Sequence, residues 1–334
     1  MNRTSKLIII AEIGINHNGS LKLAKKLVKH AKTCGADYVK IQNYIPNMIV
    51  TKNTPKANYQ KNKNLEEKMF SMLDKYHFSF KKTIELIKFC KKIKIKFLSS
   101  PFDELSFEFL KKNKLNLIKV PSGEITNYPL LKLIGKYNKK IILSTGMSYL
   151  SEIKKTLKFL IKNGLNKKNI SLLHCTSQYP TKPKDVNLRA MLTLKKKFNL
   201  DIGLSDHTLG FESSICAVYL GAKVIEKHLT LNKRMKGPDH LTSLEPEEFK
   251  KFVISLRNTK FISGSPIKQP TQNEKKLSKL VRKKIVAKKF IKKGELFDPK
   301  NITVKRSNKG RDASNYFKTI NKKAKKNYRI DEAI

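Results

Sequence analysis

The sequence predicts an α/β protein: a (β/α)8 or TIM barrel followed by a small β-rich domain. Two observations favour the barrel. Eight short apolar runs recur through residues 7–230, and amphipathic stretches with helical spacing separate most of them. Continuous apolar runs are typical of strands covered on both faces, and strand alternating with helix builds a parallel sheet. A doubly wound open sheet is the alternative, but no G-x-G-x-x-G turn follows the first run.

The predicted elements follow one another with little interruption. The strands are expected at Leu7–Gly14, Tyr38–Gln42, Lys96–Phe102, Leu117–Glu124, Lys140–Gly146, Ile170–Ser177, Asp201–His207 and Val224–Thr230. Amphipathic helices are clearest at Leu21–Cys34, Phe80–Lys92 and Ser151–Asn163, where apolar side chains recur on one face. The long interval 43–80 predicts an inserted loop or small helices over the active face.

The character of the chain changes near residue 262. We expect a barrel domain at 1–262, a linker at 263–280 and a small domain at 281–334. Serine, glycine and proline between residues 263 and 270 favour the linker. The short apolar segments that follow, with Lys-Gly turns, predict a β-rich module; they are Lys284–Ala287, Phe290–Glu295 and Ile302–Lys305.

The formal net charge of +46 would by itself suggest a nucleic-acid partner. However, the lysines are spread along the whole chain, and only eight of the basic residues are arginines. We therefore expect no nucleic-acid partner and a positive field that attracts an anionic substrate. No run of 18 uncharged apolar residues exists, so no membrane partner is expected. The four cysteines form no C-x-x-C pair, which is typical of reduced thiols in a cytoplasmic protein.

Polar residues follow nearly every predicted strand. In a parallel barrel the carboxyl ends of the strands meet on one face, where active sites lie. His207 and His228 end the last two strands, and two imidazoles placed there can hold a divalent metal. Two protein ligands leave positions open for water and substrate, and oxygen-rich surroundings favour Mn²⁺ or Mg²⁺. His17 and His174 are candidates for supporting positions around this metal.

Lys40 and Lys119 interrupt otherwise apolar strands. A lysine inside a barrel is costly unless it meets an anion, so the two lysines predict a phosphate or carboxylate site. Serines at neighbouring strand ends would complete this cradle; they are Ser122, Ser144 and Ser205. Glu12 and Glu124 lie among apolar neighbours, as a general acid or base would, or they pair with the site lysines.

Several of these segments are similar to the sialic acid synthase family. In chain order they are Glu12–Gly19, Pro121–Pro129, Leu143–Met147, His174–Thr176, Gly203–Thr208 and Gly237–Asp239. The similarity runs over nearly the whole chain. The basic tail resembles the family's C-terminal antifreeze-like (SAF, β-clip) domain, with Lys292–Glu295 and Val304–Arg306 as its anchors.

This resemblance implies a transferase that condenses phosphoenolpyruvate with an N-acylated amino sugar. The enol carbon attacks the open-chain aldehyde, water adds to the oxocarbenium carbon, and phosphate leaves by C–O cleavage. The product is a nine-carbon 2-keto acid. The metal on His207 and His228 would activate the aldehyde, and a domain-swapped homodimer is implied.

The resemblance also implies which residues bind each substrate. Phosphoenolpyruvate would be held by Lys40, Lys119, Ser122, Ser144 and Ser205. The sugar would be held by Gln42, Glu124, Ser177, Tyr179 and Asp239, with Arg306 reaching toward its acylamino group from a second subunit. Ser307 replaces the proline usual after the Lys-Arg pair.

The segments Thr51–Gln60 and Asn187–Met191 look more like the legionaminate synthases within this family. Those enzymes use a 2,4-diacetamido-2,4,6-trideoxy sugar in place of N-acetylmannosamine. Ser177 stands where neuraminate synthases carry asparagine, which favours the same subgroup. An N-acetylneuraminate synthase is the alternative.

Two hypotheses that assign the protein to another functional class remain open. A Schiff-base aldolase would use Lys40 or Lys119 as its nucleophile. A non-catalytic protein that binds nucleic acid or ice would need neither metal nor His207.

Overall fold

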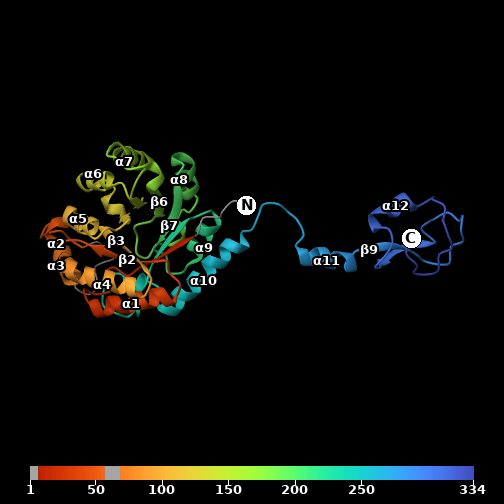
Figure 1. Cartoon of the computed structure of the whole chain (residues 1–334), viewed down its shortest axis with the longest axis horizontal. Helices are drawn as coiled ribbons and strands as arrows, with labels where there is room; N and C mark the ends of the chain where they lie inside the picture. Colours follow the sequence, from red (N-terminus) through yellow and green to blue (C-terminus); the bar gives the residue numbers. More distant parts are fainter. Residues whose placement is uncertain (1–6, 57–67) are drawn as a thin grey trace. The chain divides into compact units, whose positions relative to one another are not determined.

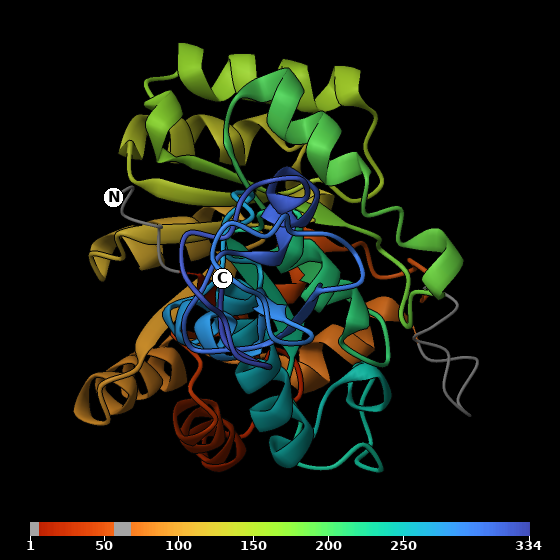
Figure 2. The same cartoon turned by 90° about the vertical axis from the view of Figure 1, so that its right-hand side faces the viewer.

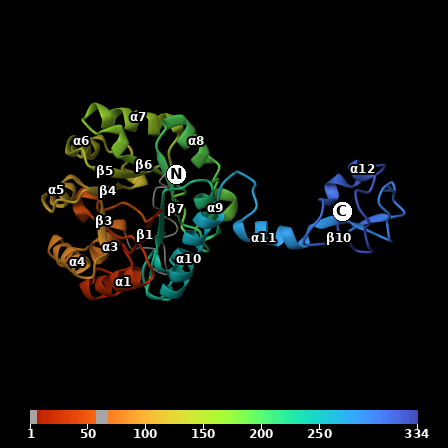
Figure 3. The ribbon, with the colours of Figure 1, turned by 45° about the vertical axis from the view of Figure 1, so that its right-hand side comes forward.

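The computed structural model describes residues 7–56 and 68–334. The chain divides into two compact units, Met1–Gly264 and Ser265–Ile334. Figure 1 colours them along the sequence, from red and orange to blue. In the first unit, helices surround a ring of strands (Figures 2 and 3).

Eight parallel strands form one sheet in the order β3-β2-β1-β8-β7-β6-β5-β4. β3 also lies against β4, which closes the ring and confirms the predicted barrel. The strands are β1 Ile8–Glu12, β2 Tyr38–Asn43, β3 Lys96–Pro101, β4 Leu117–Val120, β5 Lys140–Ser144, β6 Ile170–Cys175, β7 Asp201–Asp206 and β8 Val224–His228. Seven of the eight strands end one to four residues earlier than predicted, and the residues beyond them belong to the turns at the barrel mouth.

The outer layer consists of helices that follow the strands. They are α1 Leu21–Thr33, α4 Phe80–Lys92, α5 Glu104–Lys112, α6 Tyr128–Tyr137, α7 Leu150–Lys162, α8 Ala190–Phe198, α9 Glu212–Tyr219 and α10 Pro246–Ile262. Side-chain caps start several of them: Ser20 accepts a hydrogen bond at the beginning of α1, and Asp103 does so for α5. Two small helices, α2 Pro46–Ile49 and α3 Met69–Tyr76, lie in the long interval between β2 and β3.

Short 3-10 turns connect several of these elements. They are η2 Ser122–Glu124, η3 Lys167–Asn169, η4 Pro183–Asp185, η5 His240–Thr242 and, in the second unit, η6 Ala313–Asn315. η2 occupies the end of the predicted fourth strand, so Ser122 and Glu124 lie on a turn rather than in the sheet.

The inside of the barrel changes from apolar to polar along each strand. Ile10, Ile142 and Val224 belong to a buried apolar cluster within the ring. Two residues further along each strand come Glu12, Ser144 and Glu226, which line a pocket. Since side chains of a strand alternate between its faces, residues two apart share the inner face. The apolar layer therefore lies directly beneath a polar layer that faces the pocket.

The second unit has its own small core. β9 Lys283–Ala287 and β10 Ile302–Arg306 form an antiparallel pair, and α12 spans Tyr316–Thr319. The core contains Ile285, Ala287, Ile291, Phe297, Ile302, Ala324 and Tyr328. The segment predicted as a strand at Phe290–Glu295 contributes an isolated bridge, from Ile291 to Tyr328.

Part of the segment predicted as a linker is helical. α11 covers Gln272–Val281. It begins at a capping box in which Thr271 and Glu274 bond to each other's backbone, so a helix starts directly after the prolines of the predicted linker. Among the described residues, no helix is long and apolar enough to cross a membrane.

Candidate active site

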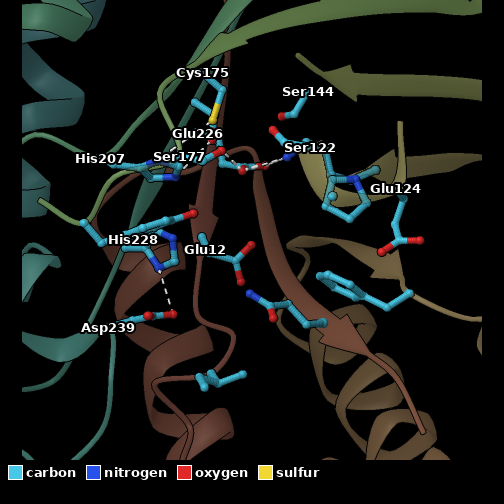
Figure 4. A pocket seen from close by; sticks show the side chains of 18 of the residues that line it. Glu12, Ser122, Glu124, Ser144, Cys175, Ser177, His207, Glu226, His228 and Asp239 are labelled. Atoms are coloured by element: carbon cyan, nitrogen blue, oxygen red, sulfur yellow. Dashed lines mark hydrogen bonds and ion pairs between the residues drawn. The ribbon is translucent and has the colours of Figure 1, made fainter. Parts of the chain in front are cut away.

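A pocket of about 490 Å³ opens at the carboxyl ends of the barrel strands. Its lining includes every residue predicted to bind a substrate or the metal or to act in catalysis, except Arg306: Glu12, Lys40, Gln42, Lys119, Ser122, Glu124, Ser144, Ser177, Tyr179, Ser205, His207, His228 and Asp239. Figure 4 shows labelled side chains from β1, β5, β6 and β8 around one space. Residues spread over more than 220 positions therefore converge on one site.

Strand register explains why the charged residues meet. Glu12 on β1 is the register partner of Lys40 on β2 and of His228 on β8. In the neighbouring pair of strands, β7 and β8, Ser205 is the register partner of Glu226. The parallel barrel therefore brings these side chains to one level at the mouth.

A buried charge network occupies the base of the pocket. Lys40 forms ion pairs with Glu12 and, at 3.6 Å, with Glu226 Oε1. Lys119 Nζ donates to both carboxylate oxygens of Glu226, at 2.9 and 3.2 Å. The Ser205 hydroxyl donates to Glu226 Oε1 at 3.0 Å. Glu226 therefore connects both predicted anion-binding lysines.

Glu226 is one of the polar residues at the carboxyl ends of the predicted strands, but it is not among the predicted site residues. The sequence around it does not indicate that its carboxylate faces the two lysines. Only the closure of β8 on β1 and the width of the barrel bring Lys119 from β4 within reach. The predicted pairing of Glu12 with a site lysine is present, whereas Glu124 accepts a hydrogen bond from Asn127 Nδ2 at 2.7 Å.

Burial and neighbouring charges shift the pKa values of these groups in different directions. Burial raises the pKa of Glu12 to about 7 in spite of Lys40. Burial also opposes the charged form of Glu226, but Lys119 and Lys40 hold its pKa low, at about 2. Burial lowers the pKa of the Lys119 ammonium against the pull of Glu226. The base of the pocket thus combines a firmly ionised carboxylate with one that can exchange a proton near neutrality.

The two imidazoles lie next to each other. The ring centroids of His207 and His228 are 5.6 Å apart. His207 Nδ1 is 2.8 Å from Thr176 O, which leaves its Nε2 toward Ser205 Oγ at 3.5 Å. His228 Nδ1 is buried and has no hydrogen-bond partner within the described chain, and Asp239 Oδ2 lies 3.9 Å away (Figure 4).

These donors fit a divalent cation. Burial, with the nearby His207 and Lys40 charges, holds the pKa of His228 well below its usual value, so its ring is neutral and can act as a ligand. No cluster of three or more histidine, cysteine or acidic side chains with metal-ligand geometry occurs in the part of the chain that the structure describes. Two imidazoles with a carboxylate nearby suit an ion that keeps several water or substrate ligands.

A second buried ion pair supports the turn that carries His207. Lys227, on the outer face of β8, is fully buried and pairs with Asp206 at 3.1 Å. Its ammonium also donates to the carbonyl oxygens of Thr208 and Gly210, at 2.6 and 2.7 Å. Asp206 in turn accepts from the Thr208 amide at 2.9 Å. Because these contacts flank His207 on the chain, they restrict the position of its ring.

The serines form a polar side of the pocket near β4 and β5. The Ser122 hydroxyl accepts a hydrogen bond from the Gly146 amide at 3.0 Å. A Cβ at position 146 would come within 2.4 Å of Ser177 Oγ and 2.8 Å of Ser122 Oγ, so only glycine allows both hydroxyls to approach. The Ser144 hydroxyl is buried and unpartnered within the described chain, which indicates a polar ligand at this side.

The two histidines predicted to lie at supporting positions around the metal contact other parts of the chain. His17 packs against Phe78 at 4.5 Å between ring centroids, and its Nδ1 lies 3.1 Å from the Gly19 amide. His174 Nε2 is 2.6 Å from Val186 O. None of these contacts involves His207 or His228, so the hypothesis that His17 and His174 support the metal stays a prediction. Tyr179, in contrast, packs on His207 with ring centroids 4.1 Å apart.

The remaining sequence signals lie further out. Arg306 is exposed on β10 of the second unit, opposite Lys283. Asn187 and Arg189 line a neighbouring cavity of about 810 Å³, which shares Ser177 with the main pocket. Of the segment Thr51–Gln60, residues 57–60 lie outside the described residues.

The apolar residues of the lining that the sequence does not predict include Ile49, Met69, Met72, Leu73 and Phe102. These five come from α2, from α3 and from the position directly after β3. Their apolar character alone would have assigned them to the core, and no sequence signal distinguishes a pocket wall from a core position.

Comparison with known proteins agrees with this geometry. The chain matches the model of the NeuB family over residues 27–268. It is 49% identical to an N,N'-diacetyllegionaminic acid synthase of Campylobacter jejuni over 98% of the chain and 99% of that protein. It is 35% identical to the human N-acetylneuraminate-9-phosphate synthase over 98% of the chain and 90% of that protein.

A solved structure shares both sequence and fold. The N-acetylneuraminic acid synthetase of Leptospira borgpetersenii, crystallised with citrate, superposes with a TM-score of 0.72 and 32% identity. The match covers 82% of this chain and 90% of that one. A family match over most of the barrel, together with relatives aligned from end to end, leads to one conclusion: the chain belongs to the NeuB family.

Proposed function

We propose that this protein is a nonulosonic (sialic-type) acid synthase that condenses phosphoenolpyruvate with an N-acylamino sugar aldehyde. The products are a nine-carbon 2-keto acid and phosphate, with N,N'-diacetyllegionaminate as the product we favour. The observation that carries this proposal is one pocket that holds both a lysine–serine cradle and two adjacent imidazoles. The near half identity to a diacetyllegionaminic acid synthase supports the choice of product.

The cradle suits phosphoenolpyruvate because that substrate carries both phosphate and carboxylate. Lys40 and Lys119 supply positive charge, while Ser122, Ser144 and Ser205 supply hydroxyl donors. Glu226 holds the two ammonium groups together before the substrate enters. This arrangement would orient the enol carbon toward the imidazole side of the pocket.

His207 and His228 would hold a Mn²⁺ or Mg²⁺ ion, with Asp239 close by. Such an ion, when bound, supplies Lewis-acid polarisation of the aldehyde oxygen. Tyr179 packs on His207 and shields that side from water. Gln42, Glu124 and Ser177 would bind the sugar hydroxyl and amide groups.

Glu12 is placed to move a proton. It lies beside Lys40 at the base of the pocket, and its pKa of about 7 allows it to accept or release a proton near neutrality. We propose that Glu12 accepts the proton that is released when water adds to the oxocarbenium carbon. Loss of phosphate by C–O cleavage then leaves the 2-keto acid.

The mouth of the barrel has an apolar rim that favours the proposed domain-swapped homodimer. Met147, Tyr149, Leu209 and Leu241 are exposed on loops that follow β5, β7 and β8. A small domain with a limited core of its own gains by covering such a surface. We therefore propose that residues 281–334 form an SAF domain that caps the site of a second subunit. We also propose that the homodimer is cytoplasmic.

Replacing Arg306 by alanine should raise the KM for the sugar about 10-fold and leave the KM for phosphoenolpyruvate nearly unchanged. The physical reason is the loss of one charged hydrogen bond to the acylamino group. Steady-state kinetics with each substrate varied in turn measures this, and Arg311→Ala in the same unit is the control. An equal rise for both substrates would count against a sugar contact.

The proposed function is tested by following phosphate release from phosphoenolpyruvate. We expect release only when an acceptor is present, and faster with the 2,4-diacetamido-2,4,6-trideoxy sugar than with N-acetylmannosamine. EDTA should abolish the reaction and Mn²⁺ should restore it. Faster turnover of N-acetylmannosamine would favour an N-acetylneuraminate synthase, the second candidate, which the Leptospira relative supports.

A Schiff-base aldolase would behave differently. It would resist EDTA, and borohydride would trap substrate on Lys40 or Lys119. Burial opposes the charged form of Lys40, but Glu12 and Glu226 raise the pKa of its ammonium, which disfavours the free amine that a nucleophile at this position needs.

A further inference from the structure

The substrate pocket has an apolar wall as well as a charged base. This apolar wall consists of Ile49, Met69, Met72, Leu73 and Phe102. The same residues pack around buried Ile15, Tyr44 and Tyr76 in a small cluster separate from the main core. Met72 is 3% exposed, and the other four are half-buried. The wall is therefore a packed surface that presents alkyl and aromatic groups to the pocket.

The order of the strands separates Phe102 of this wall from the imidazoles. In the closed ring, β3 is separated from β7 by three strands in either direction. Phe102 directly follows β3, and α2 and α3 lie between β2 and β3 in the chain. His207 directly follows β7, and His228 ends β8. An acceptor whose reactive end is at the imidazoles would extend its other end toward the apolar wall.

The chemistry of the wall distinguishes between possible acceptors. A hydroxyl placed against methionine, leucine and phenylalanine loses its hydrogen bonds to water and finds no partner. A methyl group placed there gains from burial, and flexible methionine side chains adapt to its shape. The remote end of N-acetylmannosamine carries hydroxyls, including one on C6. The diacetamido-trideoxy sugar carries a C6 methyl and a second acetamido methyl instead.

We propose that the apolar wall is the subsite for the alkyl groups at the remote end of the acceptor, and that it selects 6-deoxy, acylated amino sugars over polyhydroxylated ones. This inference rests on the proposed function, since it concerns the second substrate of the same pocket. The wall has no role toward phosphoenolpyruvate, which binds at the lysines. The alternative is that the apolar wall only forms the core beneath α3 and does not contact a substrate.

Three acceptors separate these roles. N-acetylmannosamine and 2-acetamido-2,6-dideoxymannose differ only by the hydroxyl on C6, and the diacetamido-trideoxy sugar adds the second acetamido group. For the unmodified protein we expect kcat/KM to rise in this order, by roughly 10-fold or more at the first step. Equal kcat/KM for the first two sugars would overturn the inference while leaving the synthase activity intact.

The variant Met72→Gln replaces a thioether with an amide of similar size. We expect it to lower the preference for the 6-deoxy sugar over N-acetylmannosamine by roughly 10-fold, with the KM for phosphoenolpyruvate unchanged. Met69→Gln, at a half-buried position of the same wall, tests the same point if Met72→Gln does not fold. Met48→Gln is the matched control, because Met48 lies next to Ile49 on α2, is 46% exposed and does not line the pocket.

The outcomes are distinguishable. A loss of preference in the Met72 or Met69 variant but not in the Met48 variant supports the subsite. An equal decrease for all three sugars shows that the wall is only structural and overturns the inference. If the unmodified protein releases no phosphate with any of the sugars, the proposed function itself fails.

Discussion

Replacing His228 by alanine is expected to abolish turnover, by about a thousandfold or more, while the barrel remains folded. The buried Nδ1 of this ring has no hydrogen-bond partner in the described chain, so removal of the ring breaks no hydrogen bond at that atom. A neutral imidazole beside His207 serves no evident structural purpose, but it suits a ligand. Loss of a Lewis acid worth several kcal/mol accounts for the size of the effect.

The measurements are kcat for phosphate release, thermal unfolding and titration with Mn²⁺. We expect the variant to bind Mn²⁺ more weakly and to melt within a few degrees of the unmodified protein. His30→Ala, an exposed position on α1, is the control. A His228 variant that keeps its activity and still requires metal would exclude this residue as a ligand.

Replacing Glu226 by glutamine is expected to destabilise the fold by about 3–5 kcal/mol, the usual effect of removing one partner from a buried ion pair. The two ammonium groups of Lys40 and Lys119 would then lie close together with Glu12 as their remaining carboxylate. The same variant should lose its affinity for phosphoenolpyruvate, because the lysines would no longer be held in place. Urea unfolding and substrate titration measure the two effects.

The stability effect should depend on pH in a defined direction. The pKa of Glu226 is lowered from 4.5 to about 2 in the folded protein, so this carboxylate stabilises the fold above pH 4.5. That contribution is lost as the pH falls from 4.5 toward 2. The difference in unfolding free energy between the variant and the unmodified protein should therefore be largest near neutrality and shrink in acid.

Two further variants serve as controls. Glu226→Gln combined with Lys119→Met should recover part of the lost stability, since it removes one of the unpaired ammonium groups. Glu108→Gln breaks an exposed ion pair with Lys111 and should change the unfolding free energy by less than about 1 kcal/mol. A Glu226 variant as stable as the unmodified protein at pH 7 would show that the network does not hold the lysines.

The barrel could be predicted because its signals are local. The apolar runs around Ile9, Leu143 and Ile225 reflect strands covered on both faces, and each of them is a strand of the sheet. The convergence of His207 and His228 also followed from the sequence, because parallel strands bring their carboxyl ends to one face. Two of the segments that are similar to the sialic acid synthase family, Leu143–Met147 and Gly203–Thr208, also lie at strand ends.

The rest depended on contacts across the ring. The role of Glu226 requires Lys119 from the opposite side of the barrel, and no local pattern indicates which charged side chain faces which. Likewise, Met72 is apolar whether it lies in a core or against a substrate. Local periodicity therefore determined the strands, the helices and the face on which the site lies. Only the closed ring decided which charges pair and which apolar side chains line the pocket, because those properties arise from distances between segments far apart in the sequence.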